Sequence, residues 1–526
     1  MNFLTLSPAW VVVLPPLLVL TVATITRNVI HALICGILAA AIIAPNSSIT
    51  LFHHGITAFH LILQHLIREI GNLDHLYTFG FLLSLGILIE YMTHTGGIER
   101  YAQLVQRYIR TKRQAETVPL ALGPLFFLDD YLNNLVGGSI VRPLFDRFHL
   151  ARAKLAYILN AMSSSQCLLI PISSWIAVIV TQLQSAGVSC SGTTALVTAD
   201  AYTLYTGTIP YMLYPIISIA SAWFIVRREI SYGPMYTEEK TASAQPVKYT
   251  SSSPHATVPL SNFLIPLVTF IGGIPLALLW RAGWNPLSGE TTWCSALQRI
   301  DLLLEVLWWS SIGAVIVSTI FFLATRRLSP ARTGTLLWSG ICMMKNSLLL
   351  LTLAWTFGTL LQEHLHTGNY IAQLIIAQAP QAIVPVVCFI TATFITASIG
   401  SSWGMMSIMI PLIIPIITVL HQVSTPVNPD ALYLLLPSLG AIFSGAAAGP
   451  HFSPITDAAI ISSATAGIPT IDHIRTMIPY ALPALVSTII GYIILAFVPH
   501  SAISISSVLI GCILFSCATY TYRTKK

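Results

Sequence analysis

Charged residues are scarce in this sequence. The chain has 526 residues but only 25 Lys and Arg and 19 Asp and Glu, so charged residues make up 8% of it and hydrophobic residues 55%. An ordinary soluble domain carries about 25% charged residues, which cover its surface. The composition therefore excludes a soluble enzyme, a disordered protein and a nucleic-acid-binding protein. Because a membrane-spanning helix uses about 20 apolar residues, the chain has room for roughly ten spans or more.

Signatures of other chemistry are missing as well. There is no GxxxxGK[ST] motif, which excludes an ATP-driven pump of the P-loop type, and no HExxH motif. The eight cysteines form no CxxC pair and no Cys/His zinc spacing. We therefore expect no cofactor and no enzymatic activity, and a membrane enzyme is the weakest alternative.

The apolar residues fall into stretches of span length and a few longer ones. They lie at about 9–26, 29–45, 77–95, 118–138, 155–187, 201–226, 260–281, 303–325, 345–361, 382–420, 432–468, 477–498 and 503–521. As straight helices, 155–187 and 432–468 would be about 50 Å long, well beyond a hydrocarbon core of about 30 Å. Both contain Pro and small polar residues, which predicts broken helices. Stretches 118–150 and 382–420 also carry Pro, Gly and polar residues inside, which predicts re-entrant hairpins.

The basic residues set the topology. Cytoplasmic loops carry the excess of Lys and Arg, and this holds if the N-terminus is outside, the C-terminus is cytoplasmic and both hairpins return to their own side. The result is an all-α polytopic membrane protein with two inverted repeats, each of five spans plus a re-entrant hairpin, and one extra C-terminal span. We place the first repeat at 1–226, a flexible cytoplasmic linker at 227–258, the second repeat at 259–498 and the extra span with a basic tail at 499–526. Secondary transporters have this architecture, and their sites lie at broken helices.

A faint internal repeat supports the two halves. Pro171-Ile172-Ser173-Ser174 aligns with Pro454-Ile455-Thr456-Asp457, and Asp129-Asp130-Tyr131 aligns with Ser401-Ser402-Trp403. Both aligned pairs lie in the segments that we predict to be broken helices or hairpins.

Acids inside the membrane segments are the main functional candidates, because a buried charge in a bilayer is costly. Asp129 and Asp130 are adjacent, so a regular helix would point them about 100° apart and only a broken backbone aims both at one ion. Asn133 adds an amide oxygen one turn later. The expected role is cation or proton binding, and the alternative is a buried acid satisfied by Arg142 or by backbone N–H groups. Glu90 is a further acid inside a predicted span, with a structural role and a gating role as its two alternatives.

The second broken helix carries Asp457 together with His451, Ser453 and Thr456. The spacing of 453, 456 and 457 places three oxygen ligands on one helical face. His451 titrates near neutrality and is a candidate pH sensor, or else a buried neutral histidine. The remaining hydroxyl candidates are Ser173, Ser174 and Ser402. We assign the transported Na⁺ to Asp129, Asp130 and Asp457.

These residues resemble the NhaC family of Na⁺/H⁺ antiporters. The matching blocks are Phe127 to Asp146 (FLDDYLNNLVGGSIVRPLFD), Pro171 to Ile176 (PISSWI), Ser401 to Gly404 (SSWG) and Ser453 to Asp457 (SPITD). The resemblance covers about 77–490 and implies a secondary-active transporter that exchanges sodium for protons by alternating access. Relatives of the family move small organic acids or amino acids.

The sequence departs from the family at three positions. Family members usually have Asp at the position of Asn160, Asp at that of Pro450 and Cys at that of Phe452. The loss of two acids keeps open an alternative, a cation-coupled transporter of an amino acid or small carboxylate. Trp175, Trp403 and Tyr131 would then line an organic pocket.

The expected surroundings follow from this interpretation. The partners are the lipid bilayer, Na⁺ and protons, with an organic substrate and a homodimer as open alternatives, and the location is the bacterial inner membrane. Segment 46–76 holds five histidines and no Cys, and we favour an interfacial amphipathic helix over a metal site there. Lys345 is expected to open a span and snorkel to the interface. Cys190 and Cys294 both fall in outside loops, where a disulfide can form.

Overall fold

The structure is a computed structural model, and it is almost entirely helical. It describes residues 9–26, 28–44, 51–127, 129–190, 195–244, 258–281, 303–367, 370, 381–454, 456–497 and 511. Two short strands, β1 (Val188–Ser189) and β2 (Val197–Thr198), form one parallel pair. The prediction of an all-α polytopic membrane protein is confirmed.

The helices fall into two series, before and after the predicted boundary between the two repeats. The first comprises α1 (Leu14–Thr26), α2 (Val29–Ile43), α3 (Leu51–Ile70), α4 (Leu73–His94), α5 (Gly97–Tyr108), α6 (Lys112–Leu122), α7 (Asp130–Arg147), α8 (Arg152–Leu169), α9 (Ser174–Ser185), α10 (Ala201–Thr208), α11 (Leu213–Arg227) and α12 (Gly233–Ala244). The second comprises α13 (Ser261–Arg281), α15 (Leu303–Ala324), α16 (Pro330–Thr359), α18 (Val384–Ile399), α19 (Ser402–Leu420), α20 (Leu435–Ala448), α21 (Asp457–Ala466) and α22 (Thr470–Phe497). Short 3₁₀ and π turns join several of them, among them η3 (Ile209–Tyr211), η5 (Leu360–Leu365) and η8 (Gly449–His451).

Many of these helices are long and apolar enough to cross a membrane. Within the described residues there are seven such helices, or up to nine if each of two bent helix pairs counts as one span. The predicted span 9–26 is helical throughout, because the 3₁₀ turn η1 (Ala9–Val13) leads directly into α1. The predicted span 29–45 is shorter than expected, because α2 has 15 residues, and at 1.5 Å per residue such a helix reaches about 23 Å. The predicted extra span 503–521 lies outside the described residues.

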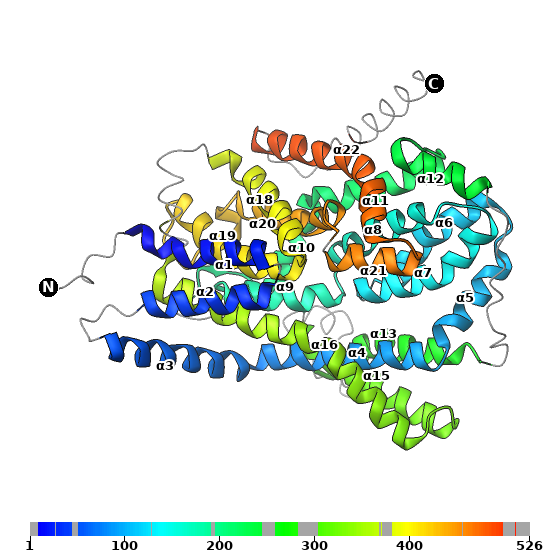
Figure 1. The fold of residues 1–526 in the computed structure, drawn as a ribbon. Coiled ribbons are helices and arrows are strands. Elements are labelled where there is room, and N and C mark those ends of the chain that lie inside the picture. The colour runs from blue at the N-terminus through cyan, green and yellow to red at the C-terminus, as the bar shows by residue number, and fades with distance from the viewer. Residues whose placement is uncertain are drawn as a thin grey trace.

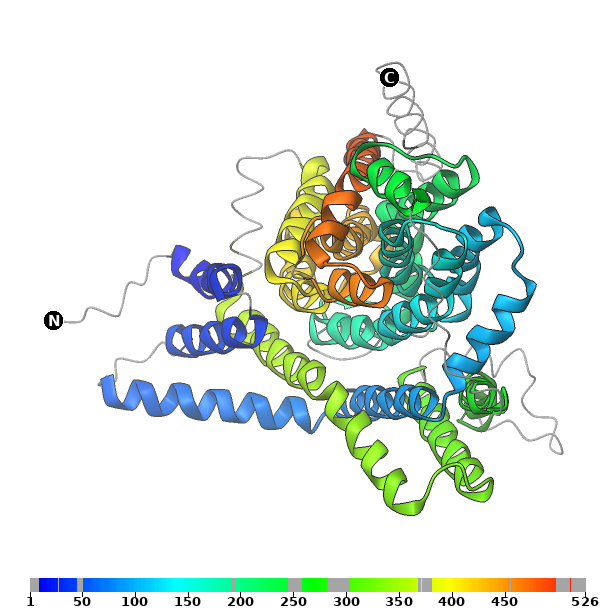
Figure 2. The same cartoon turned by 45° about the vertical axis from the view of Figure 1, so that its right-hand side comes forward.

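Both predicted hairpins are present. The first consists of α6 and α7 and turns at 123–129, and the second consists of α18 and α19 and turns at Gly400 and Ser401. Figure 1 shows the first hairpin entering from the right and the second from the left, so that their turns meet near the centre of the molecule. This opposed entry is the arrangement that inverted repeats predict. In the turned view of Figure 2, the two hairpins still belong to one compact bundle, and α3, α4, α15 and α16 lie along its side.

Both predicted broken helices are also present, and their breaks match the sequence repeat. α8 and α9 meet at a 51° bend, and α20 ends before η8 and a non-helical segment that precedes α21. The aligned residues Ser174 and Asp457 are the first residues of α9 and α21. In the same way, the aligned residues Asp130 and Ser402 are the first residues of α7 and α19. The faint sequence repeat therefore reflects equivalent points of the fold.

Two predictions of helix boundaries are wrong. Stretch 201–226 is not one straight span, because α10 and α11 meet at a 51° bend near Pro210, whose ring cannot continue the helix. The span predicted at 345–361 begins earlier, at Pro330, because Ser329 caps a 30-residue helix. Lys345 therefore lies in the middle of α16 rather than opening it.

The linker predicted at 227–258 is not flexible throughout. Residues 233–244 form α12, and Tyr232 before it donates its hydroxyl to the carbonyl of Pro479 at 2.7 Å. Glu239 of α12 forms an ion pair with the buried Lys154 of α8, with 3.0 Å between Nζ and Oε1. These contacts hold α12 against the helix bundle. Residues 245–257 lie outside the described residues.

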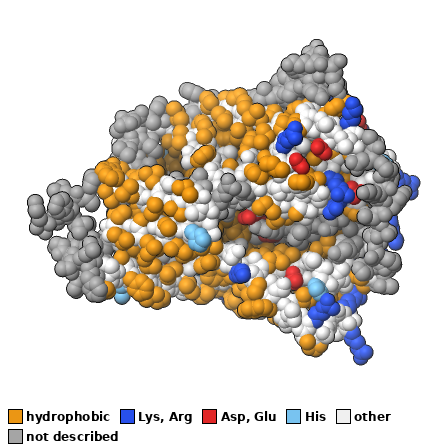
Figure 3. All heavy atoms as spheres, viewed as in Figure 1, with side chains coloured by type: hydrophobic (Ala, Val, Ile, Leu, Met, Phe, Trp, Pro, Cys, Tyr) orange, Lys and Arg blue, Asp and Glu red, His pale blue; other side chains and the backbone are white. Residues whose placement is uncertain are grey.

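The surface is typical of a membrane protein. In Figure 3, apolar side chains cover most of the left and central part of the visible face, and Lys and Arg side chains gather toward the right. That end carries α5, α6 and α12 in Figure 1. An excess of basic residues on one side is typical of the cytoplasmic side.

Candidate ion and substrate site

The four helix interruptions surround one pocket of about 420 Å³. Its walls come from both hairpins, both broken helices, α2 and α16. The lining residues are Asn28, Ile30, Asp129, Asp130, Trp175, Met343, Met344, Asn346, Leu350, Ile399, Gly400, Ser401, Ser402, Trp403, Pro450, Thr456, Asp457 and Ala458. Figure 3 shows this face hollowed near its centre, with acidic side chains visible there.

The first hairpin and the first broken helix place two buried carboxylates. Asp129 precedes α7 and Asp130 opens it, and both side chains are buried. Ser174 donates its hydroxyl to Asp129, with 2.9 Å between Oγ and Oδ2. Trp175 donates its indole N–H to Asp130, with 3.2 Å between Nε1 and Oδ1. The first two residues of α9 thus orient both acids. The interruption between α8 and α9 brings the start of α9 next to them.

The second hairpin and the second broken helix meet at the pocket. Gly400 ends α18 with a left-handed φ of 86°, which glycine adopts without steric cost. The backbone N–H of Asp457 donates to the Gly400 carbonyl at 3.2 Å, and Ser402 donates its hydroxyl to the carbonyl of Ala446 at 2.8 Å. The side chain of Asp457 is exposed, unlike Asp129 and Asp130, so this acid lies at the open part of the pocket.

Helix ends add fixed partial charges to the pocket. α7, α9, α19 and α21 all begin at it, and the N-terminus of a helix carries a partial positive charge. Asp130 and Asp457 are the first residues of α7 and α21, where that charge favours the ionised carboxylate. Ile399 and Gly400 at the end of α18 and Pro450 also line the pocket. The pocket can therefore receive a cation at its acids and an anionic group at its helix N-termini.

Two indoles form an aromatic wall. Trp175 and Trp403 stand edge to face, with 6.4 Å between ring centroids and 88° between their planes. Both line the pocket, as predicted for an organic substrate. The side chain of Tyr131 lies outside the part of the chain that the structure describes.

The predicted site residues separate into two groups. The pocket brings together Asp129, Asp130, Ser402, Thr456 and Asp457, and Ser174 joins them through its bond to Asp129. The remaining four, Asn133, Ser173, His451 and Ser453, are buried but do not line the pocket.

Two of these four have well-defined partners elsewhere. Asn133 donates to the side-chain oxygen of Gln166 at 3.0 Å, and Ser173 donates to the carbonyl of Cys167 at 2.7 Å. The expectation that 453, 456 and 457 share a helical face is wrong, because α21 begins only at Asp457.

His451 belongs to a separate buried polar cluster behind the pocket. Its Nδ1 lies 2.5 Å from the hydroxyl of Tyr214, a contact that satisfies a buried imidazole. Nearby, Asn160 donates to the carbonyl of Pro450 at 3.3 Å, and its Nδ2 lies 3.1 Å from Nε2 of His473. The polar residues of the two broken helices thus hold the break in place as well as lining the pocket.

Some lining residues were not predicted from the sequence. Asn28, which caps α2 by accepting from the N–H of His31, and Asn346 of α16 both line the pocket. The signal for Asn346 was present, because Lys345-Asn346 is a polar pair inside an apolar run. Glu90 does not line the pocket. Cys190 is exposed, and the predicted disulfide cannot be followed because Cys294 lies outside the described residues.

Residues 400–404 read G-S-S-W-G and so fit the pattern GxSxG of serine hydrolases. That pattern needs a strand before the serine and a histidine beside it. Here α18 precedes Ser402, and the hydroxyl of Ser402 donates to a backbone carbonyl. The structural context of a hydrolase nucleophile is therefore missing among the described residues.

Comparison with known proteins places the chain among transporters. Residues 166–497 match the Na⁺/H⁺ antiporter family, a range that includes the second hairpin and Asp457 but not Asp129 and Asp130. An uncharacterised protein of Haemophilus influenzae is 28% identical over 500 residues, which are 93% of this chain and 91% of that protein. The crystal structure of the Alcanivorax borkumensis YdaH transporter, described as having an unusual topology, is similar with a TM-score of 0.58. That likeness has 17% identity and covers 93% of this chain and 98% of that one. The Neisseria gonorrhoeae MtrF structure, from a class of antimetabolite efflux pumps, gives a TM-score of 0.46 at 14% identity over 92% of this chain and 95% of that one.

Proposed function

The chain belongs to the Na⁺/H⁺ antiporter family, and from this premise we propose that it exchanges Na⁺ for protons by alternating access. The observation that carries the proposal is the convergence of Asp129, Asp130 and Asp457 on one pocket. These are three acids of a chain that has only 19 Asp and Glu. Intramembrane carboxylates are costly to keep unless they bind something.

The exchange follows from competition for the same oxygens. Sodium is a hard cation that prefers carboxylate, hydroxyl and carbonyl oxygens, and each carboxylate can instead hold a proton. Ser401, Ser402 and Thr456, whose side chains carry neutral hydroxyl oxygens, also line the pocket. Because Na⁺ and protons cannot occupy one carboxylate together, binding of one releases the other, and no ATP is needed.

Alternating access requires that the pocket open to one side at a time. The two hairpins enter from opposite ends (Figure 1), and residues of both turns line the pocket. The Asp457–Gly400 hydrogen bond links the second hairpin to the second broken helix, so these two elements are expected to move together. Transporters with inverted repeats commonly rock one such unit against the other.

Reconstituted protein tests the exchange. Proteoliposomes with an inward-acid pH gradient should lose the gradient when Na⁺ or Li⁺ is added outside, and K⁺ should have no effect. Asp457→Asn should abolish the response, and Asp430→Asn, which removes an exposed acid of a loop, should leave it intact. If no concentration of Na⁺ or Li⁺ moves protons in wild-type protein, the exchange proposal is wrong.

A second function uses the same site, the cation-coupled transport of an amino acid or small carboxylate. The pocket volume of about 420 Å³ favours it, because ligand pockets for small organic molecules begin at about 300 Å³. The two indoles offer apolar surface, and the four helix N-termini suit a carboxylate group. Uptake of a labelled amino acid or carboxylate that requires a Na⁺ gradient would select this function, and absence of uptake across the panel would remove it.

The remaining parts of the proposal concern location and assembly. We place the protein in the bacterial inner membrane with the N-terminus outside and the C-terminus in the cytoplasm, because the basic residues concentrate on one side. A homodimer is the proposed assembly. Cross-linking of intact membranes and labelling of single introduced cysteines from each side test both statements.

A further inference from the structure

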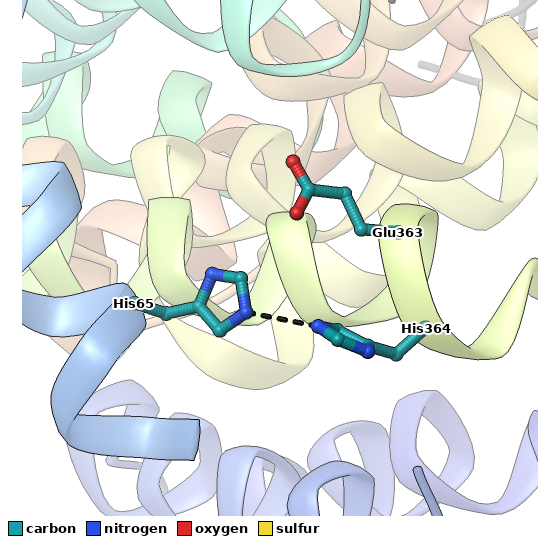
Figure 4. A group of neighbouring side chains, drawn as sticks. All are labelled: His65, Glu363 and His364. Atoms are coloured by element: carbon teal, nitrogen blue, oxygen red, sulfur yellow. Dashed lines mark hydrogen bonds between the residues drawn. The ribbon is translucent and has the colours of Figure 1, made fainter. Parts of the chain in front are cut away.

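A second polar cluster lies away from the pocket, where α3 meets the end of α16. α3 supplies His65, and the π-helical turn η5 supplies Glu363 and His364. One ligand atom from each of the three residues lies within 4.8 Å of the other two. Figure 4 shows the ring nitrogens of the two histidines facing each other. Segment 46–76 has two acids of its own, Glu69 and Asp74, but the acid beside His65 is Glu363, which η5 supplies from far along the chain.

The two imidazoles meet in a geometry that suits a shared metal ion. Nε2 of His65 lies 3.0 Å from Nε2 of His364, and the ring planes are 86° apart. Two nitrogens bound to one tetrahedral zinc ion at 2.0–2.1 Å are about 3.3 Å apart. A shift of a few tenths of an ångström therefore converts the contact into a ligand pair.

The side chain of His65 is buried, and its Nε2 atom faces the cluster. The residue is 4% exposed, so its ring is held in place by packing. Among the described residues, Nδ1 of His65 has no hydrogen-bond partner, so the polar contact of the ring is made by Nε2, the atom that faces the cluster.

The shape of η5 turns the other two ligands outward. Leu360, Leu361 and Leu365 of this turn are buried. Glu363 and His364 are exposed on its other side, toward α3. π-Helical turns inside longer helices often occur at functional sites.

Arg68 would compete with a metal ion for the carboxylate of Glu363. Its Nη1 lies 3.0 Å from both oxygens of Glu363, and the two side chains are 60% and 40% exposed. Ion pairs this exposed contribute little to stability. Arg68 can therefore release the carboxylate to a divalent ion.

We propose that His65, Glu363 and His364 form a site for a divalent transition-metal ion, best matched by zinc. Two imidazole nitrogens and one carboxylate oxygen are a known zinc ligand set that leaves a fourth position for water. Calcium and magnesium prefer all-oxygen ligands, which this cluster does not offer. A bound ion ties α3 to the end of α16, the helix that lines the pocket through Met343, Met344 and Asn346.

Zinc titration of the purified full-length protein tests the site without any ion gradient, so the result is independent of whether Na⁺/H⁺ exchange is found. The protein for this titration is purified without a polyhistidine tag, and Zn²⁺ binding is followed by calorimetry and by competition with a chromogenic chelator. Wild-type protein should bind one Zn²⁺ per chain at this site, and Ca²⁺ and Mg²⁺ should not compete.

Matched variants decide the assignment. His364→Ala and Glu363→Gln change exposed side chains and should fold normally, and each should weaken Zn²⁺ binding at least about tenfold. His60→Ala removes an exposed histidine of the same helix and should bind as the wild type does. Absence of stoichiometric binding, or equal affinity in His364→Ala, His65→Ala and wild-type protein, would overturn the proposal.

Discussion

The side-chain amide of Asn160 donates a hydrogen bond to the backbone carbonyl of Pro450, with 3.3 Å between Nδ2 and the oxygen. The two residues are 290 positions apart in the chain. They are also the two positions at which this sequence differs from the acids that its resemblance to the NhaC family leads one to expect. The two replacements are therefore neighbours, and together they exchange a pair of acids for one neutral hydrogen bond.

The variant Asn160→Asp tests this relationship. An ionised carboxylate cannot donate to the Pro450 carbonyl and would repel it, so we expect a loss of stability of about 1–3 kcal/mol. At low pH the carboxyl group is protonated and can donate again. The loss should therefore be larger at pH 8 than at pH 5 in thermal unfolding of the purified protein. Asn160→Ala serves as control, because its loss should not depend on pH. Equal stability of Asn160→Asp and wild type at pH 8 would contradict the assignment.

Variants of two adjacent serines distinguish an effect on cation binding from an effect on stability. Ser174 donates to the carboxylate of Asp129, whereas Ser173 donates to a backbone carbonyl at the end of α8. A hydrogen bond to a charged group is worth about 1.5–3 kcal/mol, so Ser174→Ala should change the half-saturating Na⁺ concentration about tenfold or more. Ser173→Ala should lower the melting temperature and leave that concentration nearly unchanged. The same Na⁺ dependence in both variants would contradict a role for Ser174 at the site.

Gly400 provides a test of the turn between α18 and α19. Its φ of 86° lies in the left-handed region, where a Cβ atom costs about 1–2 kcal/mol. Gly400→Ala should destabilise the protein by about that amount and slow transport, because the carbonyl that binds the Asp457 N–H is displaced. Gly55→Ala is the control, since an added Cβ there meets nothing within 4 Å and φ is not left-handed. Unchanged stability and transport in Gly400→Ala would show that the turn does not need glycine.

The buried ion pairs of Lys154 should matter far more than an exposed pair. Nζ of Lys154 lies 3.0 Å from both Glu116 and Glu239, and its side chain is 4% exposed. Lys154→Met leaves two acids without their partner, which should cost about 3–5 kcal/mol and release α12 from the bundle. Arg68→Gln breaks an exposed pair and should cost at most about 1 kcal/mol. Thermal unfolding measures the loss of stability, and limited proteolysis of α12 measures its release. Equal losses of stability in the two variants would contradict the predicted difference between a buried and an exposed ion pair.

The sequence predicted the interruptions of the fold well, because Pro, Gly and polar residues inside an apolar run interrupt a membrane helix and are rarely kept in a straight one. Both hairpins and both broken helices lie where they were expected, and the repeat alignment identified Ser174 and Asp457 as equivalent helix starts. The bend near Pro210 was missed because stretch 201–226 has an ordinary span length and few polar residues. α12 was missed because its composition is typical of a linker, and its order depends on the distant partner Lys154.

The candidate site was predicted less completely. The acids were found because charge is rare in this chain, but the direction of each neutral side chain depends on local backbone that the sequence does not reveal. Ser453 and Thr456 were assigned to a helical face, yet the helix starts only at Asp457. Asn346 comes to the pocket from α16, and Glu363 comes to His65 from η5, through packing between distant segments. Such contacts arise from tertiary structure and leave no local pattern.

Proton release on Na⁺ binding tests the central claim most directly. Purified protein in detergent and weak buffer is titrated with Na⁺ while the pH is recorded, with choline as the control cation. The account predicts that Na⁺ releases protons from wild-type protein, and that release is reduced in Asp129→Asn, Asp130→Asn and Asp457→Asn but not in Asp430→Asn. Na⁺ binding without proton release, or release that is unchanged in the three pocket variants, would contradict competition of Na⁺ and protons for these carboxylates.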